Sequence, residues 1–184
     1  GVVIRSGHSD MEIIGGEIIN ENHQYRETQQ LYHGIEIETG DEVTLRSFKV
    51  HGFSGLALNP MCEVNLKGFT SERNGAGIYF HEPSTMRDCQ VNWLRAVSGD
   101  SYAYRVAKSL EANNSGCQLD ENGALGVFVL EEGATVTING GDYQFKAPLP
   151  FLTALGSSTA ILNNVTINGE LFNVIAITAD NLLL

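Results

Sequence analysis

Two long stretches of this sequence gather aromatic and ionisable side chains that could do chemistry. They read INENHQYRETQQLYHG, between Ile18 and Ile35, and NWLRAVSGDSYA, between Val91 and Tyr104. The only tryptophan, Trp93, and half of the six tyrosines fall in them. Aromatic faces with polar groups between them suit a sugar ring, which is apolar on one face and hydroxylated at its edge. The alternative is that these side chains only pack the stretches against the body of the protein.

A pair of carboxylates offers a second kind of chemistry. Glu36 and Glu38 are two residues apart in an alternating Ile-Glu-Ile-Glu segment, so both point to the same side of the expected strand. Two carboxylates about 5 to 9.5 Å apart can catalyse glycoside hydrolysis. A solvated strand face is the simpler explanation of the same two residues.

A repeated pattern must position these side chains. A short apolar strand recurs eight times, and its third residues stand at positions 4, 37, 58, 80, 106, 129, 154 and 176. Seven of these strands are followed by a second pattern, as in Leu66-Lys-Gly-Phe-Thr-Ser71, whose first residue is apolar. Glycine, asparagine and aspartate predominate at its third position, and they tolerate the left-handed backbone of a sharp turn. These third residues are Gly15, Ser47, Gly68, Asp88, Asn114, Gly140 and Asn164.

Each block is therefore expected to form one turn of a coil, in which like strands stack in parallel and apolar side chains form ladders inside. The residues expected to point inward along one sheet are Ile37, Leu58, Phe80, Val106 and Val129. This pattern and period resemble the right-handed parallel β-helix of the pectate-lyase-like superfamily, and most of all the β-helix domains of phage tailspikes and tail fibres. The resemblance covers essentially the whole chain and predicts an all-β solenoid of about eight coils.

The two long stretches interrupt the repeat at one corner, whereas the connections after Val50 and Ser71 are short. Insertions at one corner of a solenoid project from one side, so we expect them to flank a trough over the coils between them. If the protein hydrolyses a bound sugar, Glu72 and Asp100 are the expected acid and base, because both are carboxylates near the aromatic residues. The residues expected to bind the saccharide are His33, His51, Arg73, Trp93, Tyr102 and Tyr104.

Motifs of the known enzymes of this superfamily are missing from the sequence. It has none of the NTD, DD, GHG and RIK motifs of polygalacturonases, no DPHD motif of alginate epimerases, and no calcium-binding aspartate cluster with RxPxxR of pectate lyases. Tailspikes place catalytic carboxylates without a shared linear motif, so hydrolase, lyase and pure binding functions all stay open. The resemblance implies a domain that engages a polysaccharide or surface glycan, outside the cell or on a virion. The alternative is a non-enzymatic structural shaft or adhesin.

The last third of the sequence is poor in charge. After Phe151 the only charged residues are Glu170 and Asp180. An apolar outer face on successive coils marks an interface, and resemblance to tailspikes implies a homotrimer through residues 151–184. The residues alone also allow a dimer or a missing partner domain. The outward positions expected to form this face are Phe128, Leu130, Thr153, Leu155, Ile175 and Ile177.

Three cations fall at one outward position of successive blocks. Arg46, Lys67 and Arg87 occupy this column, and Asn113, Asn139 and Asn163 continue it. Stacked strands place such residues about 4.8 Å apart, a distance at which like charges repel. Either nearby carboxylates neutralise this ladder, which is the simpler reading, or an anion binds to it.

Composition limits the remaining possibilities. A formal charge of −11 and a pI of about 4.7 argue against sequence-independent binding of nucleic acid and against binding to an anionic membrane surface. No apolar run approaches the roughly 18 residues of a membrane span, so we expect no membrane insertion. The sequence carries no P-loop, GxGxxG or GxSxG motif. We therefore expect no cofactor.

The histidines and cysteines give no sign of a metal site. The histidines lack close ligand spacing such as HExxH, and the cysteines, odd in number, include no CxxC pair. Cys62, Cys89 and Cys117 are expected to be buried free thiols. The length fits a single domain over residues 1–184, and the start at Gly1 with a strand close behind suggests a fragment of a longer protein.

Overall fold

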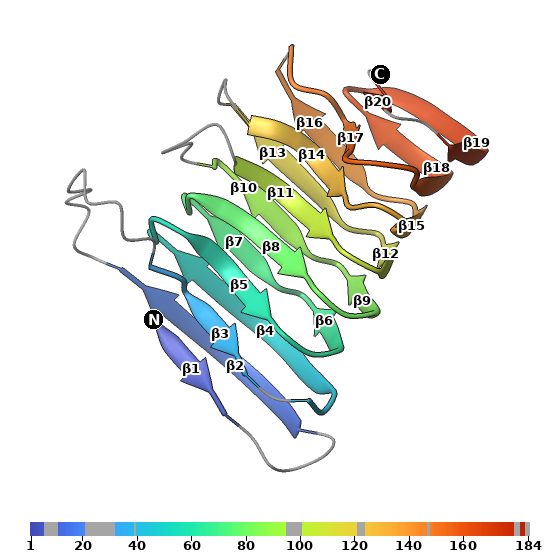
Figure 1. Ribbon diagram of the computed structural model, residues 1–184. Coiled ribbons are helices and arrows are strands. Elements are labelled where there is room, and N and C mark those ends of the chain that lie inside the picture. Colours follow the sequence, from blue (N-terminus) through green and yellow to red (C-terminus); the bar gives the residue numbers. More distant parts are fainter. Residues whose placement is uncertain are drawn as a thin grey trace.

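The computed structural model describes residues 1–5, 11–20, 32–38, 40–94, 101–120, 124–146, 148–178 and 181–182, with the backbone alone for 174–178 and 181–182. This part of the chain is all β and contains no helix that could span a membrane. The strands form two sheets that wind into one parallel solenoid (Figure 1). The first sheet consists of β1 (Val2–Ile4), β3 (Ile35–Ile37), β5 (Leu56–Pro60), β8 (Ala76–Phe80), β11 (Ser101–Val106), β14 (Ala124–Leu130), β17 (Leu152–Ala154) and β20 (Asn181–Leu182).

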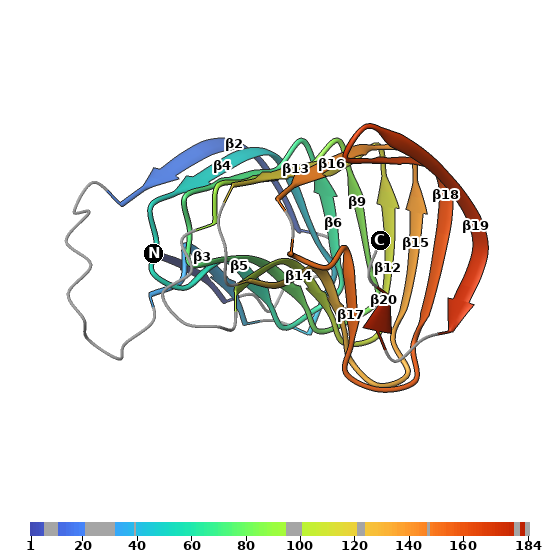
Figure 2. The ribbon, with the colours of Figure 1, turned by 90° about the horizontal axis from the view of Figure 1, so that it is seen from above.

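The second sheet bends and supplies two sides of each coil. It consists of β2 (Met11–Ile19), β4 (Val43–His51), β6 (Val64–Lys67), β7 (Thr70–Glu72), β9 (Ser84–Arg87), β10 (Gln90–Asn92), β12 (Ser109–Asn113), β13 (Gly116–Leu119), β15 (Thr135–Asn139), β16 (Asp142–Phe145), β18 (Thr159–Ile167) and β19 (Glu170–Thr178). In Figure 2, β13 and β16 lie along one side of the solenoid, β6, β9, β12 and β15 along a second, and β3, β5 and β14 along a third.

The stack has fewer coils than the eight expected. Within the described residues, the five coils from β3 to β16 have parallel neighbours on both sides in each ladder. The eighth strand of the sequence pattern, residues 174–176, does not extend the parallel sheet. It belongs to β19, which pairs antiparallel with β18.

A two-residue turn causes this reversal. Asn168 and Gly169 join β18 to β19 with φ angles of 49° and 87°. Two successive positive φ angles in a two-residue hairpin are typical of a type I′ turn, for which Asn-Gly is the preferred sequence. The last coil therefore ends in a hairpin, because the turn folds the chain back before another parallel strand can form.

The second sheet has two arms, one that contains β6, β9, β12 and β15 and one that contains β7, β10, β13 and β16. The tight corner between these arms is confirmed at all seven predicted positions. Their φ angles lie between 47° and 70°, in the left-handed region. At four of these corners the backbone hydrogen bonding continues around the bend, because the amides of Gly68, Asp88, Asn114 and Gly140 donate to carbonyls of the next coil; from Asp88 to Asn113 the distance is 3.0 Å. The backbone therefore turns sharply without leaving its polar groups unpaired.

The inward face of the first sheet is correctly predicted except at one strand, although Leu58 pairs with Ile35 and Ile78 and not with Ile37 and Phe80. Ile37, Leu58, Phe80 and Val106 are fully buried in the main core. Val129, expected beside them, pairs with the outward Arg105 and packs in a smaller apolar cluster on the outer face. A slip of one residue exchanges the two faces of a strand. The predicted alternation in β14 is shifted by one residue, so its inward and outward faces are exchanged.

Because of this shift, part of the expected apolar outer face is wrong. Phe128 and Leu130 point inward, where the Phe128 ring stacks on Tyr104 with centroids 5.0 Å apart. Leu155 is outward and 53% exposed, whereas Thr153 is half-buried and donates a hydrogen bond to the Leu125 carbonyl. The described outer face is therefore not a continuous apolar surface.

The core is filled by the stacked ladders and holds the three thiols. Cys62, Cys89 and Cys117 are buried and free, as predicted. Burial raises the pKa of Cys62 and Cys89 to about 11 and raises that of Cys117 further. These thiols stay protonated at neutral pH and behave as small apolar side chains.

Candidate functional site

A second corner lies where the chain leaves the arm of the second sheet that contains β7 and β10. It holds two of the expected binding residues. Arg73 and Trp93 follow β7 and β10 and have φ angles of 52° and 50°, whereas Gly52 follows β4 with 84°. The Arg73 amide donates to the Asn92 carbonyl at 3.1 Å, and the Trp93 amide donates to the Gln118 carbonyl at 2.9 Å. The same corner thus recurs in three coils, with glycine only in the first.

Bulky residues rarely adopt this backbone conformation. A non-glycine residue in the left-handed region costs about 1–2 kcal/mol, and such strain concentrates at functional sites. The two side chains lie together, with the Arg73 guanidinium carbon 6.0 Å from the centroid of the Trp93 ring. The corner therefore presents an aromatic plane beside a cation at the surface of two adjacent coils.

The preceding residues add polar groups to this corner. His51, Glu72 and Asn92 are aligned in neighbouring strands. A Glu72 carboxylate oxygen lies 3.0 Å from the Lys49 ammonium, and this hydrogen bond raises the pKa of Lys49. Asp100, the second carboxylate of the expected acid and base, lies outside the described residues. The described corner thus carries an aromatic ring, a guanidinium group, neutral polar side chains and one ion-paired carboxylate.

Tyr104 was expected to stack on a sugar, and the structure corrects this placement. Its side chain is fully buried, and its hydroxyl donates to the Gly116 carbonyl at 2.5 Å. Strand alternation requires it, because Val106, two residues later, also points inward. Tyr104 is therefore part of the core and is not available to a ligand at the surface.

Two other expected binding residues lie on or beside the first sheet. Tyr102 is 5% exposed and packs in the outer apolar cluster. His33 accepts a hydrogen bond at Nδ1 from the Leu56 amide at 2.9 Å, and burial lowers its pKa although Glu36 opposes the effect. The structure therefore brings together His51, Glu72, Arg73 and Trp93 on neighbouring coils and gives Tyr102 and His33 other contacts.

Of the pair Glu36 and Glu38, Glu38 forms an ion pair and Glu36 lies beside a histidine. Glu36 Oε1 lies 3.7 Å from His33 Nε2, and Glu38 Oε2 lies 2.7 Å from Arg5 Nε. Each carboxylate thus has its own cationic or titratable partner, as on an ordinary solvated strand face. This geometry favours a solvated strand face over a catalytic pair of carboxylates.

A polar cluster on the outer face of the first sheet was not recognised in the sequence. Tyr79 donates to Glu131 at 2.5 Å, Arg105 donates to the same oxygen at 2.9 Å, and the Arg105 guanidinium lies 4.8 Å from the Tyr79 ring centroid. Burial alone would raise the pKa of Glu131, but the bonds from Tyr79 and Arg105 outweigh it and lower the pKa. If Val129 is assigned to the outer face, Glu131, two residues later, is predicted on the same face as Arg105.

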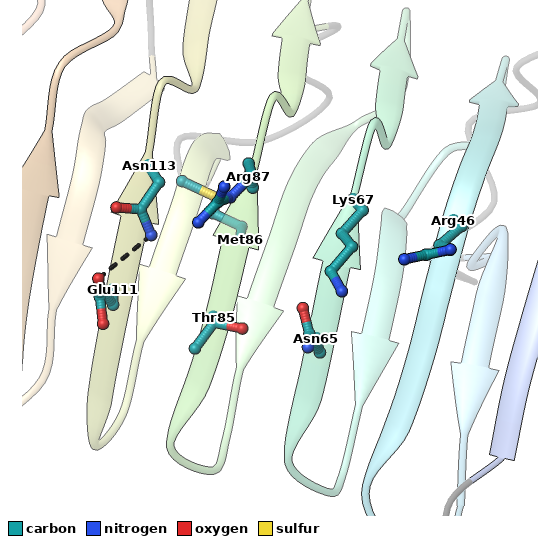
Figure 3. Close-up of a pocket in the computed structure, with 8 residues that line it drawn as sticks. All are labelled: Arg46, Asn65, Lys67, Thr85, Met86, Arg87, Glu111 and Asn113. Atoms are coloured by element: carbon teal, nitrogen blue, oxygen red, sulfur yellow. Dashed lines mark hydrogen bonds between the residues drawn. The ribbon is translucent and has the colours of Figure 1, made fainter.

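The predicted cation column is confirmed by the strand register. Arg46 pairs with Lys67 and Lys67 with Arg87, and the asparagines follow in β12, β15 and β18. A groove of about 530 Å³ lies over this part of the second sheet (Figure 3). Among the described residues, no group of three or more histidine, cysteine, aspartate or glutamate side chains could hold a metal ion.

The fold defines the class of protein to which the chain belongs, the parallel β-solenoids. Comparison with family models, with curated proteins and with solved structures finds no match to the chain. Fold alone does not determine activity. The function must therefore be argued from the surface groups that the solenoid displays.

Proposed function

We propose that the chain is a carbohydrate-binding β-solenoid that engages a saccharide at the corner formed by Arg73 and Trp93. The observation that carries the proposal is the positive φ angle of both residues. The first coil shows that glycine fits this corner, so the bulky side chains cost stability that a purely structural corner would not require.

The chemistry of the corner suits a sugar. The Trp93 ring offers a face for the apolar side of a pyranose, and Arg73 offers a planar donor for a hydroxyl or an acidic substituent. Glu72 and Asn92 add hydrogen-bonding groups on the adjoining strands. In this proposal the domain is displayed outside the cell or on a virion, as the resemblance to tailspike domains implies, and binding rather than turnover is its main activity.

Replacement by glycine tests this proposal, because it removes the side chain and relieves the backbone. The protein is first screened against a panel of polysaccharides for binding, and for new reducing ends or unsaturated products. We expect Trp93→Gly and Arg73→Gly to abolish binding while the free energy of unfolding stays the same or rises by about 1 kcal/mol. Gln118→Ala, an exposed change on the adjoining coil, serves as the control and should leave binding intact.

The same variants test the alternative, a structural shaft. If the panel yields no ligand and Trp93→Gly lowers the free energy of unfolding, the ring serves packing and the proposal fails. Glu72→Gln separates binding from turnover. Preserved binding with loss of products would show that Glu72 takes part in catalysis.

A further inference from the structure

The groove lies on the arm of the second sheet that contains β6, β9 and β12, and it carries three cations in one row. Arg46, Lys67 and Arg87 project from β4, β6 and β9 at paired positions, and Figure 3 shows their cationic ends aligned across the three strands. Paired strands lie about 4.8 Å apart. The row therefore concentrates positive charge over a short distance on a protein whose formal net charge is −11.

Among the described residues, a carboxylate pairs with only one end of this row. Arg46 lies 3.1 Å from Glu12. Within the described parts of the chain, neither Lys67 nor Arg87 forms an ion pair, although both line the groove. The simpler expectation, a ladder neutralised by nearby acids, thus holds for Arg46 and does not extend to the other two cations.

The far end of the groove is acidic but is already occupied by hydrogen bonds within the protein. Glu111 Oε1 accepts from the side-chain amides of Asn113 at 3.2 Å and Asn139 at 3.4 Å. Glu12 at one end and Glu111 at the other bound the positive region. A long polyanion would therefore meet the negative charge of Glu111 at one end of the groove and that of Glu12 beyond Arg46, whereas a single anionic group between Lys67 and Arg87 would contact neither.

The neutral side chains of the groove indicate what would carry that anionic group. Asn65 and Thr85 lie on the strands that bear Lys67 and Arg87 and are aligned with each other, with Asn113 on the next strand. Amides and hydroxyls both donate and accept hydrogen bonds, which matches the hydroxyl groups of a sugar. An acidic peptide side chain would offer acceptors only.

We propose that this groove is a binding site for an acidic oligosaccharide, separate from the Arg73 and Trp93 corner. One carboxylate or sulfate group of the sugar lies between Lys67 and Arg87 and removes their mutual repulsion, and neighbouring hydroxyls bond to Asn65, Thr85 and Asn113. A volume of about 530 Å³ is within the range of small-ligand sites, about 300–1,000 Å³.

The test uses the 184-residue chain and three hexasaccharides in titration calorimetry at 50 mM and 300 mM NaCl. An oligogalacturonate supplies carboxylates, a carrageenan fragment supplies sulfates, and cellohexaose is neutral. We expect one or both acidic sugars to bind more weakly at the higher salt, and cellohexaose not to bind in the groove. The tighter of the two acidic sugars identifies the preferred anionic group.

Paired variants locate the binding. Lys67→Gln with Arg87→Gln should weaken it about tenfold or more, since two charge-assisted contacts are lost. Arg5→Gln with Lys146→Gln removes the same charge outside the groove and should change it by no more than about twofold. Trp93→Gly, which tests the corner, should leave it unchanged.

Three outcomes would overturn the proposal. The first is the failure of both acidic hexasaccharides to bind. The second is an equal loss of affinity in the control pair, which would mean that only net charge matters. The third is tighter binding of hexaglutamate or a single-stranded oligonucleotide, either of which would identify a different class of partner.

Discussion

Left-handed residues at one corner of every coil show how single positions fix this fold. Four of the seven corner residues are not glycine, namely Ser47, Asp88, Asn114 and Asn164. Short polar side chains lower the cost of this conformation because they can form local hydrogen bonds with their own backbone. The 2.7 Å bond from Asn114 to Asp88 is a further contact between adjacent coils. The sequence alone predicted this corner, because the preference belongs to the residue and does not depend on distant contacts.

Substitution at Gly68 measures this effect. Space is not limiting there, because the nearest atom to an added Cβ lies 3.9 Å away. We expect Gly68→Val to lower the free energy of unfolding by about 1–2 kcal/mol through backbone strain, and Gly68→Asn to lower it by less than about 1 kcal/mol. Urea denaturation provides the measurement. Equal losses for the two variants would contradict the explanation.

Two tyrosines of the outer face provide a prediction at high pH. Burial raises the pKa of Tyr79 and Tyr102 to about 12, and the bond to Glu131 adds to the effect at Tyr79. A tyrosine whose pKa is raised on folding stabilises the protein below its ordinary pKa of about 10, and this contribution is lost as the pH rises toward 12. The urea midpoint should therefore fall between pH 10 and pH 12.

Absorbance at 295 nm checks which tyrosines ionise. The increase between pH 9 and pH 11 should be nearly the same in the Tyr79→Phe, Tyr102→Phe double variant as in the parent protein. A smaller increase in the double variant, by the equivalent of two tyrosines, would show that these side chains ionise in the ordinary range.

At the scale of elements, alternation along a strand decides which side chains reach the surface. The sequence predicted the strands well, but the face of β14 was reversed because Phe128, Val129 and Leu130 are all apolar and give no alternation to follow. The burial of all three in the structure explains the ambiguity. Tyr104 was predictable, since its strand alternates clearly through Arg105.

A buried asparagine joins the end of one coil to the next. Asn74 accepts from the Phe53 amide at 2.9 Å and donates to the Val50 carbonyl and the Ser71 hydroxyl, each at 3.0 Å. We expect Asn74→Leu to lower the free energy of unfolding by about 1–3 kcal/mol, because a buried amide loses its acceptor. Asn92→Leu, on the outer face, should change it by less than about 0.5 kcal/mol.

At the scale of the whole molecule, the solenoid displays exposed apolar side chains near its last coils. Leu155 is 53% exposed and Leu171 is 69% exposed. We propose that these coils associate, as the charge-poor sequence after Phe151 predicts, and we expect a trimer by light scattering at micromolar concentration. A monomer mass would contradict the proposal.

Substitutions at the two ends of the molecule identify the surface involved. Leu155→Asp with Leu171→Asp should dissociate the trimer, since each change would place a charge in an apolar contact. Val2→Asp with Val3→Asp, at the opposite end and similarly exposed, should leave the mass unchanged.

The candidate sites show where prediction from sequence fails at this scale. The cation column was correct because each of its residues directly precedes a corner residue, which marks the same point in every coil. The trough stays a prediction, because most of the two long loops expected to form its walls lies outside the described residues. Trp93 and Arg73 lie together because the same corner repeats in successive coils. Tyr102 and His33 contact other residues, which the sequence pattern does not reveal.

The Asn168–Gly169 hairpin has a consequence for fibre formation. A parallel solenoid with two open ends can add further molecules end to end, each continuing the sheets of the last. Here β19 runs against the parallel strands. The β2 edge of another molecule, placed parallel to its own neighbour in such a fibre, would meet β19 in the opposite direction. Pairing across such a junction would be antiparallel, so the parallel ladders of the coils would end at β19.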